Sequence, residues 1–257
     1  MSDDRAKLTS ELVLRPPSYR GFADRGVESA LYGVLQRRFL NEPKECDRIL
    51  GDLLADLLPG REDVWVLDVG CGNGQCIHHL SERFPGWKFE GVDLRQSAIS
   101  EARAAFMDSQ RVALFERDLF DFEYAPQPNP NAIVRQSVTY AFTDEQFAEA
   151  LHRFRSWLTP GGIAVLFDMF TPWEQRLTVV EKSLHHPDGH LLMVRPYSQL
   201  RELATAAGLE VLEIRPFSYS GGEHWSDPHD LRSYNHEGLT MRGCFNQPQA
   251  HAVLVAV

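Results

Sequence analysis

The stretch Val66-Leu67-Asp68-Val69-Gly70-Cys71-Gly72-Asn73-Gly74-Gln75 decides the fold of this 257-residue chain. It joins an apolar run typical of a buried strand to three alternate glycines and then to an amphipathic segment typical of a helix. Glycine lets the backbone turn tightly and approach a ligand closely, where a Cβ would clash. The stretch therefore predicts a strand, a ligand-binding turn and a helix.

Apolar runs continue to alternate with amphipathic ones after this stretch, which is typical of a parallel sheet with crossover helices. No helical pattern separates the last two runs, so we expect these two strands to pair antiparallel. The predicted fold class is α/β, a Rossmann-like doubly wound seven-stranded sheet that is mostly parallel and has a C-terminal antiparallel strand. The predicted strands are 64–69, 88–92, 112–117, 132–138, 163–167, 209–217 and 250–257, and the predicted helices are 75–84, 97–107, 144–158 and 198–207.

The chain is predicted to be one domain with appendages. We expect residues 1–60, in which leucines recur at roughly helical spacing, to form an N-terminal helical cap or lid. Residues 61–257 would form the sheet domain, with polar insertions at about 171–197 and 218–249 that carry specificity or are disordered. Three residues near the start, which either form a lid over the ligand or belong to a disordered leader, are Tyr19, Arg20 and Phe22.

Composition limits the partners of this chain. Its net charge of −10 repels a phosphate backbone, so we expect no nucleic-acid or membrane binding and instead a small neutral or cationic partner. Four cysteines are too few for a disulfide scaffold, and neither a signal sequence nor a run of about 18 apolar residues is present. We therefore expect a cytoplasmic protein, and the sequence leaves open whether it forms a homodimer.

Carboxylates at the predicted strand ends indicate the charge of the ligand. Asp68 lies just ahead of the glycines, where it would oppose a pyrophosphate but attract an ammonium or sulfonium group. Gln75 stands where a dinucleotide fingerprint has its third glycine, which argues against NAD or FAD. Asp93 ends the second strand, where it can accept hydrogen bonds from ribose hydroxyls, and Asp118 follows the third. A cationic nucleoside is the ligand that fits these residues best.

With these features, the sequence resembles the class I S-adenosylmethionine-dependent methyltransferases, specifically their small-molecule branch. The resemblance covers residues 64–170, and it includes Leu158-Thr159-Pro160-Gly161-Gly162, which is similar to the family's LxPGG turn. Ala132 departs from the acid that family members often carry at that position. The resemblance implies S-adenosyl-L-methionine as cofactor, held by Asp68, Gly70, Cys71, Gly72, Gly74, Asp93, Leu94, Asp118, Leu119 and Gln136.

The resemblance also implies how these residues divide the cofactor between them. The glycine turn at residues 70–72 would approach the methionine portion and Asp93 the ribose. Leu94 and Leu119 would contact the faces of the adenine, and Asp118 its amino group. Each acid has a simpler alternative, because Asp93 could cap the following helix and Asp118 could be a turn residue.

Candidate catalytic residues follow the fourth strand and lie in the late insertion. The segment Arg135-Gln136-Ser137 would lie beside the methionine portion, and Tyr140 lies where this family has substrate-facing residues, unless it is a core aromatic. Three histidines of the late insertion are candidate general bases: His224, His229 and His236. Their spacing matches no common metal site, so we expect no metal. Because a sulfonium is already an activated leaving group, positioning would be the main task of the protein.

The resulting functional hypothesis is methyl transfer from S-adenosylmethionine to N or O of a small-molecule acceptor, in specialised metabolism. One alternative is a protein methyltransferase, since an acidic cleft could receive an Arg or Lys side chain. Another is a catalytically inactive scaffold subunit that binds the cofactor. A nucleic-acid methyltransferase is disfavoured because the chain is acidic and has Gln136-Ser137-Val138-Thr139 where an (Asp/Asn)-Pro-Pro-aromatic tetrad would be expected.

Overall fold

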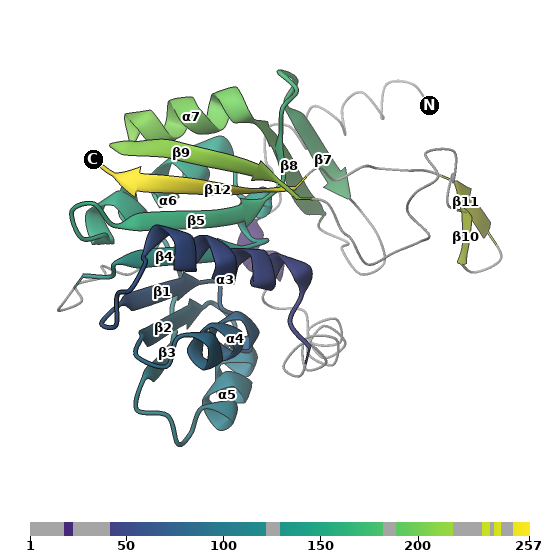
Figure 1. Cartoon of the computed structure of the whole chain (residues 1–257). Coiled ribbons are helices and arrows are strands. Elements are labelled where there is room, and N and C mark those ends of the chain that lie inside the picture. Colours follow the sequence, from purple (N-terminus) through teal and green to yellow (C-terminus); the bar gives the residue numbers. More distant parts are fainter. Residues whose placement is uncertain are drawn as a thin grey trace.

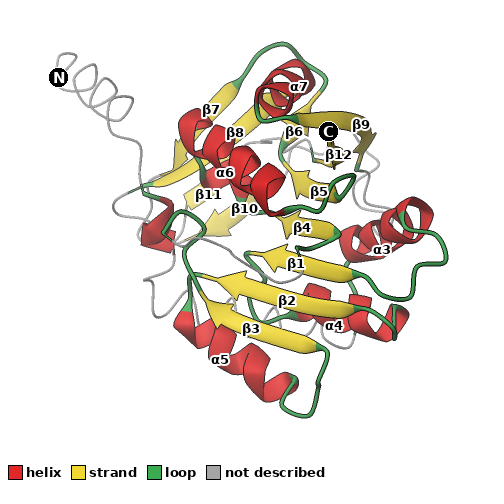
Figure 2. Cartoon of the chain, turned by 90° about the vertical axis from the view of Figure 1, so that its left-hand side faces the viewer, coloured by secondary structure: helices red, strands yellow, loops and turns green. Residues whose placement is uncertain are grey.

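A computed structural model describes residues 18–22, 42–121, 129–181, 189–217, 233–236, 239–242 and 249–257. Its centre is a seven-stranded sheet, in which only β12 runs antiparallel to its neighbours (Figures 1 and 2). This confirms the predicted fold class and the antiparallel pairing of the last two strands. In order of pairing, the strands are β3 (Val112–Glu116), β2 (Lys88–Asp93), β1 (Trp65–Val69), β4 (Ala132–Gln136), β5 (Ile163–Asp168), β12 (Ala250–Ala256) and β9 (Leu209–Pro216).

Helices cover both faces of this sheet. One hydrophobic cluster joins the sheet to α3 (Glu45–Leu57), α4 (Gln75–Arg83) and α5 (Gln96–Ala105). A second cluster joins the opposite face to α6 (Asp144–Trp157) and α7 (Tyr197–Ala206). In Figure 1, α3 and α4 lie in front of the sheet and α6 behind it. Burial of apolar side chains on both faces therefore holds the sheet between two helical layers.

The start of α6 shows how local sequence sets an element boundary. The Thr143 hydroxyl accepts a hydrogen bond from the Gln146 backbone N–H, and the Gln146 side chain accepts one from the Thr143 N–H. This reciprocal pair satisfies two N–H groups near the helix start, and it confirms the predicted start of the helix at residue 144. The observed helix ends at Trp157, one residue before its predicted end.

The first predicted insertion contains a small sheet that the sequence pattern did not reveal. Its strands pair in the order β6 (Phe170–Thr171), β8 (His190–Pro196) and β7 (Leu177–Glu181). The second insertion contains a hairpin of β10 (Ser233–His236) and β11 (Leu239–Arg242). Among the described residues, no helix is long and apolar enough to span a membrane.

Two parts of the predicted N-terminal cap are described, η1 (Tyr19–Phe22) and α3. The leucines at positions 50, 53 and 54 of α3 are buried in the same cluster as residues of β1 and α4. His251 of β12 is also buried, with its Nε2 atom 3.2 Å from the Cys46 carbonyl oxygen. The helix α3 is therefore packed into the core, and its first turn is held close to the carboxyl ends of the strands.

Candidate functional site

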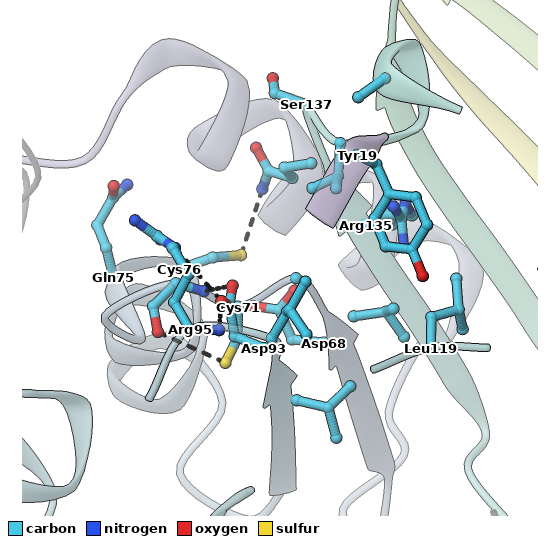
Figure 3. Close-up of a pocket in the computed structure, with 18 of the residues that line it drawn as sticks. Tyr19, Asp68, Cys71, Gln75, Cys76, Asp93, Arg95, Leu119, Arg135 and Ser137 are labelled. Atoms are coloured by element: carbon cyan, nitrogen blue, oxygen red, sulfur yellow. Dashed lines mark hydrogen bonds and ion pairs between the residues drawn. The ribbon is translucent and has the colours of Figure 1, made fainter. Parts of the chain in front are cut away.

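A pocket opens at the carboxyl ends of β1, β2 and β4, the edge where ligands bind in open α/β sheets (Figure 3). Residues from η1, from the first turns of α3 and α4, and from the short helix η2 (Thr139–Ala141) complete its walls. All the predicted cofactor-binding residues line this pocket except Gly74, and the candidate catalytic residue Tyr140 lines it as well. The fold thus gathers at one pocket residues that lie far apart in the sequence.

The glycine turn forms the floor of the pocket between β1 and α4. Gly70 has φ +81°, and a Cβ placed on it would lie only 2.8 Å from a methyl carbon of Val138. The backbone N–H groups of Gly70 and Cys71 both donate to the Val92 carbonyl, at 2.7 and 3.1 Å. Gly74 serves packing instead, because a Cβ there would lie 2.8 Å from the ring of Phe106, which directly follows α5. These contacts explain why a side chain is not tolerated at either position.

Asp93 fixes the shape of this turn from the end of β2. One carboxylate oxygen accepts a hydrogen bond from the Gly72 backbone N–H at 2.8 Å, and the other accepts from the Arg95 backbone N–H at 2.8 Å. Arg95 is the first flanking residue of α5, so Asp93 does not cap that helix in the usual way. Its side chain is buried and lines the pocket.

Asp118, after β3, links the pocket to the N-terminal segment. Both of its carboxylate oxygens lie 2.8 Å from the Tyr19 hydroxyl, which donates to them, and Arg20 Nε forms an ion pair at 2.8 Å. The Phe120 backbone N–H also donates to it, so the turn-residue alternative is correct in part. Burial is the main cause that raises the pKa of Tyr19 to about 12, so the phenol stays protonated. Tyr19 lines the pocket, whereas the side chain of Phe22 lies outside the described part.

Two buried carboxylates face the pocket from the α3 and α4 side. Asp68 is 3% exposed, and its Oδ2 atom has no hydrogen-bond partner among the described residues. Burial, with Asp47 and Asp93 nearby, raises the pKa of Asp68 to about 8. Burial also raises the pKa of Asp47, whose carboxylate accepts hydrogen bonds from the Gln75 side chain and the Lys44 backbone N–H. Sequence reasoning missed Asp47, because an acid in the first turn of an amphipathic helix is usually a surface residue.

The end of β4 turns sharply into η2, which carries Tyr140. Ser137, between the two, has φ 54°, a left-handed conformation that is unusual for a residue with a side chain. Asp168 at the end of β5 accepts hydrogen bonds from the backbone N–H groups of Thr139 and Tyr140, at 2.6 and 3.2 Å. Arg195 of β8 donates to the Thr139 carbonyl at 3.1 Å. The neighbouring strand and the insertion together hold Tyr140 in the pocket wall.

The predicted histidine bases cannot be placed in the site. His224 and His229 lie outside the described residues, and only the backbone of His236, in β10, is described. Within the described ranges, no group of three His, Cys, Asp or Glu residues is arranged to hold a metal ion.

Comparison with known proteins shows that the chain is similar to one family model, to a curated enzyme and to several solved structures. The sequence model of a family described as "Methyltransferase domain" matches residues 66–162. A malonyl-[acyl-carrier protein] O-methyltransferase of Halalkalibacterium halodurans is 26% identical over 111 residues, which cover 42% of this chain and 39% of that protein. The chain therefore spans about two-fifths of the length of this curated relative.

Solved structures resemble the whole fold more broadly. A 1,6-didemethyltoxoflavin-N1-methyltransferase of Burkholderia thailandensis has a TM-score of 0.59 at 15% identity, with 88% of this chain and 89% of that chain covered. The [4+2]-cyclase SpnF has a TM-score of 0.53 at 24% identity, with 66% of this chain and 60% of that chain covered. At such identities the likeness shows the fold alone, and the second protein, a cyclase by name, indicates that this fold also serves other chemistry.

Proposed function

Residues 66–162 form a class I methyltransferase domain of the S-adenosylmethionine-dependent family, and from this premise we propose that the protein transfers a methyl group to N or O of a small-molecule acceptor. The observation that carries the proposal is the pocket itself. It unites the glycine turn, the unpartnered oxygen of Asp68 and the Asp93 carboxylate at one sheet edge. These groups suit a cationic nucleoside, because Asp68 and Asp93 offer hydrogen-bond acceptors, and a positive charge beside Asp68 would favour its ionised form.

The residues present fit S-adenosylmethionine as the cofactor. The backbone at Gly70, where a Cβ has no room, would approach the methionine portion, and Asp93 would accept hydrogen bonds from the ribose. Leu94 and Leu119 would contact the adenine faces. An adenine amino group at Asp118 would have to share that carboxylate with the Tyr19 hydroxyl. Binding of the nucleoside is thereby coupled to the position of η1.

The chain's own part in the reaction is to orient the reactants and exclude water. When bound, the cofactor supplies a methyl group on a positively charged sulfur, which needs no further activation as a leaving group. Tyr140, in the wall held by Asp168 and Arg195, is our proposed contact for the acceptor. A neutral amine or a phenolate would need no strong base, whereas an alcohol would, and for this we retain the three late histidines as candidates.

Two alternatives remain distinct from this proposal. A protein methyltransferase would have to admit a side chain of a macromolecule into the pocket, part of whose wall is formed by Tyr19 and η2. A scaffold subunit would bind the cofactor without turnover. Our proposal of a small acceptor, in specialised metabolism, therefore rests on the pocket and not on the structural relatives, which share the fold alone.

The test has two steps. Calorimetry first measures the affinity for S-adenosylhomocysteine, the demethylated cofactor, in the wild type and in Asp93→Asn. The control is Asp63→Asn, which removes the charge of a side chain that is 90% exposed. Only Asp93→Asn should weaken binding, by about tenfold or more. A labelled-methyl assay on small amines, phenols, alcohols and carboxylic acids, run beside protein substrates, then identifies the acceptor. Transfer to proteins alone, or binding without transfer to any acceptor, would overturn the proposal.

A further inference from the structure

Arg135 of β4 is a charged side chain inside the sheet layer. Side chains alternate between the two faces of a strand. Val134 is buried in the cluster with α3 and α4, and Ile133 in the cluster with α6. Arg135 therefore points to the α6 face and Gln136 to the α4 face, where the Gln136 amide contacts the sulfur of Cys76 at 3.2 Å. In Figure 3, Arg135 lies on the side of Tyr19 and Leu119, away from Gln75 and Cys76.

The Arg135 guanidinium lines the pocket with two of its three nitrogens lacking a hydrogen-bond partner among the described residues. The residue is 2% exposed, and its Nε and Nη2 atoms have no hydrogen-bond partner among the described residues. The group packs over the Phe142 ring, 4.6 Å from the ring centroid. Burial lowers the pKa of Arg135 to about 10, so it is still charged at neutral pH. Asp168, Asp68 and Asp93 lie near enough to favour the charged form, but none of them accepts a hydrogen bond from Nε or Nη2. Buried donors without acceptors are unfavourable in the free protein, so a ligand that supplies acceptors to them gains affinity.

Arg195 shows what a partnered arginine looks like in the same protein. It is equally buried, and its guanidinium forms an ion pair with Asp144 at 3.1 Å and donates to the carbonyls of Thr139 and Phe142, at 3.1 and 2.6 Å. Nothing comparable surrounds the Nε and Nη2 atoms of Arg135 among the described residues. The contrast indicates that Arg135 serves to bind a ligand rather than to stabilise the fold.

The geometry of the unpartnered atoms identifies the ligand's chemistry. In a planar guanidinium, Nε–H and one N–H of Nη2 point in the same direction, and their spacing matches the two oxygens of a carboxylate. The cofactor has one anionic group, its methionine carboxylate. That end belongs beside the glycine turn and Gln136, on the opposite face of β4. Resting on the proposed function, we propose that Arg135 binds a carboxylate of the methyl acceptor, which makes the substrate a small carboxylic acid.

The alternation of side chains along β4 bears on the segment Arg135-Gln136-Ser137, which was expected to lie beside the methionine portion. The alternation of β4 divides it, so that Gln136 faces that portion and Arg135 faces the space bounded by Tyr140, Phe142 and Tyr19. A carboxylate held there would fix the acceptor beside Tyr140.

The test is calorimetry on protein saturated with S-adenosylhomocysteine. The probes are acetate, succinate, benzoate and 4-hydroxybenzoate, each compared with its neutral amide at concentrations on the order of 10 mM. The proteins are the wild type, Arg135→Met, Arg135→Lys and the control Arg48→Met, which removes an exposed arginine that does not line the pocket. We expect at least one carboxylate, and not its amide, to bind the wild type and the control alike. Arg135→Met should lose about tenfold or more in that affinity, and Arg135→Lys should fall between them.

Three results would overturn the inference. The first is that no carboxylate binds the wild type in preference to its amide. The second is that Arg135→Met, checked for folding by circular dichroism, keeps the wild-type carboxylate affinity. The third is that Arg135→Met loses tenfold or more in affinity for S-adenosylhomocysteine itself, which would assign the guanidinium to the cofactor. Failure of the wild type to bind S-adenosylhomocysteine would instead count against the proposed function, so the two failures are distinguishable.

Discussion

Replacing the two buried arginines by methionine should change the stability of the protein in different directions. Arg195→Met removes an ion pair with Asp144 and two hydrogen bonds to the carbonyls of Thr139 and Phe142. Asp144 would keep its ion pair with Arg176, and the Thr139 carbonyl would keep the Phe142 backbone N–H, but the Phe142 carbonyl would lose the Arg195 donor. Arg135→Met removes no hydrogen bond from Nε or Nη2 to the described residues. The two substitutions are otherwise matched in side-chain chemistry and burial.

The expected magnitudes follow from these contacts. Breaking a buried ion pair from one side costs about 3–5 kcal/mol, and our estimate for Arg195→Met is the lower end, about 3 kcal/mol, because Asp144 keeps its ion pair with Arg176. Replacing a poorly compensated buried charge by an apolar side chain of similar length is neutral or stabilising by about 1–4 kcal/mol. The stacking of Arg135 on Phe142 offsets about 1 kcal/mol of that gain. We therefore expect Arg135→Met to be at least as stable as the wild type.

Urea unfolding followed by circular dichroism measures both free energies of unfolding. The m-value should stay constant across the three proteins, which shows that the same surface is exposed on unfolding. A loss of stability in Arg135→Met as large as that in Arg195→Met would refute the reasoning. It would mean that the Arg135 guanidinium has stabilising partners in solution, and it would weaken the case for a ligand there.

Three further predictions concern the glycine turn and the buried ionisable groups. Gly70→Ala should destabilise the protein by about 1–3 kcal/mol and weaken S-adenosylhomocysteine binding, because its Cβ would lie 2.8 Å from a Val138 methyl carbon. Gly72→Ala, whose Cβ would have its nearest atom at 3.4 Å, should lose less stability in urea unfolding and less affinity in calorimetry. Equal losses in the two variants would contradict this. Burial lowers the pKa of His251 to about 4, so the folded state should lose about 3 kcal/mol as pH falls from 6.5 to 4, and His251→Gln should remove that part of the acid sensitivity. The pKa of Asp68 is raised from 3.8 to about 8, so the free energy of unfolding should fall as pH rises through that range. Urea unfolding at pH 5 and at pH 8 should show a smaller fall for Asp68→Asn than for the wild type.

Much of the site could be predicted from the sequence because it depends on local rules. Parallel strands end at the same sheet edge, so the glycine turn, Asp93 and Asp118 were expected to meet there, and they line one pocket. The helix 144–158 was likewise predicted, and α6 covers Asp144–Trp157. Gly74 was the exception, since its lack of a side chain serves helix packing against Phe106.

Other features depended on contacts that no local pattern encodes. The strands of the first insertion were missed because short segments of mixed polarity pair only where a neighbouring strand is available, as β8 is for β7. Asp47 resembled a surface acid until the packing of α3 buried it.

By itself, the sequence determined the α/β sheet, the order of its strands and helices, and the glycine turn with its acidic residues, because side-chain periodicity and backbone freedom act over a few residues. Only the tertiary structure decided which charged side chains are buried away from water. It brings Tyr19 to Asp118 across 99 residues of chain and gives Arg195 partners on η2, while it leaves the Nε and Nη2 atoms of Arg135 without one in the described structure. The physical reason is that burial and pairing of a charge depend on neighbours that folding brings from distant parts of the chain.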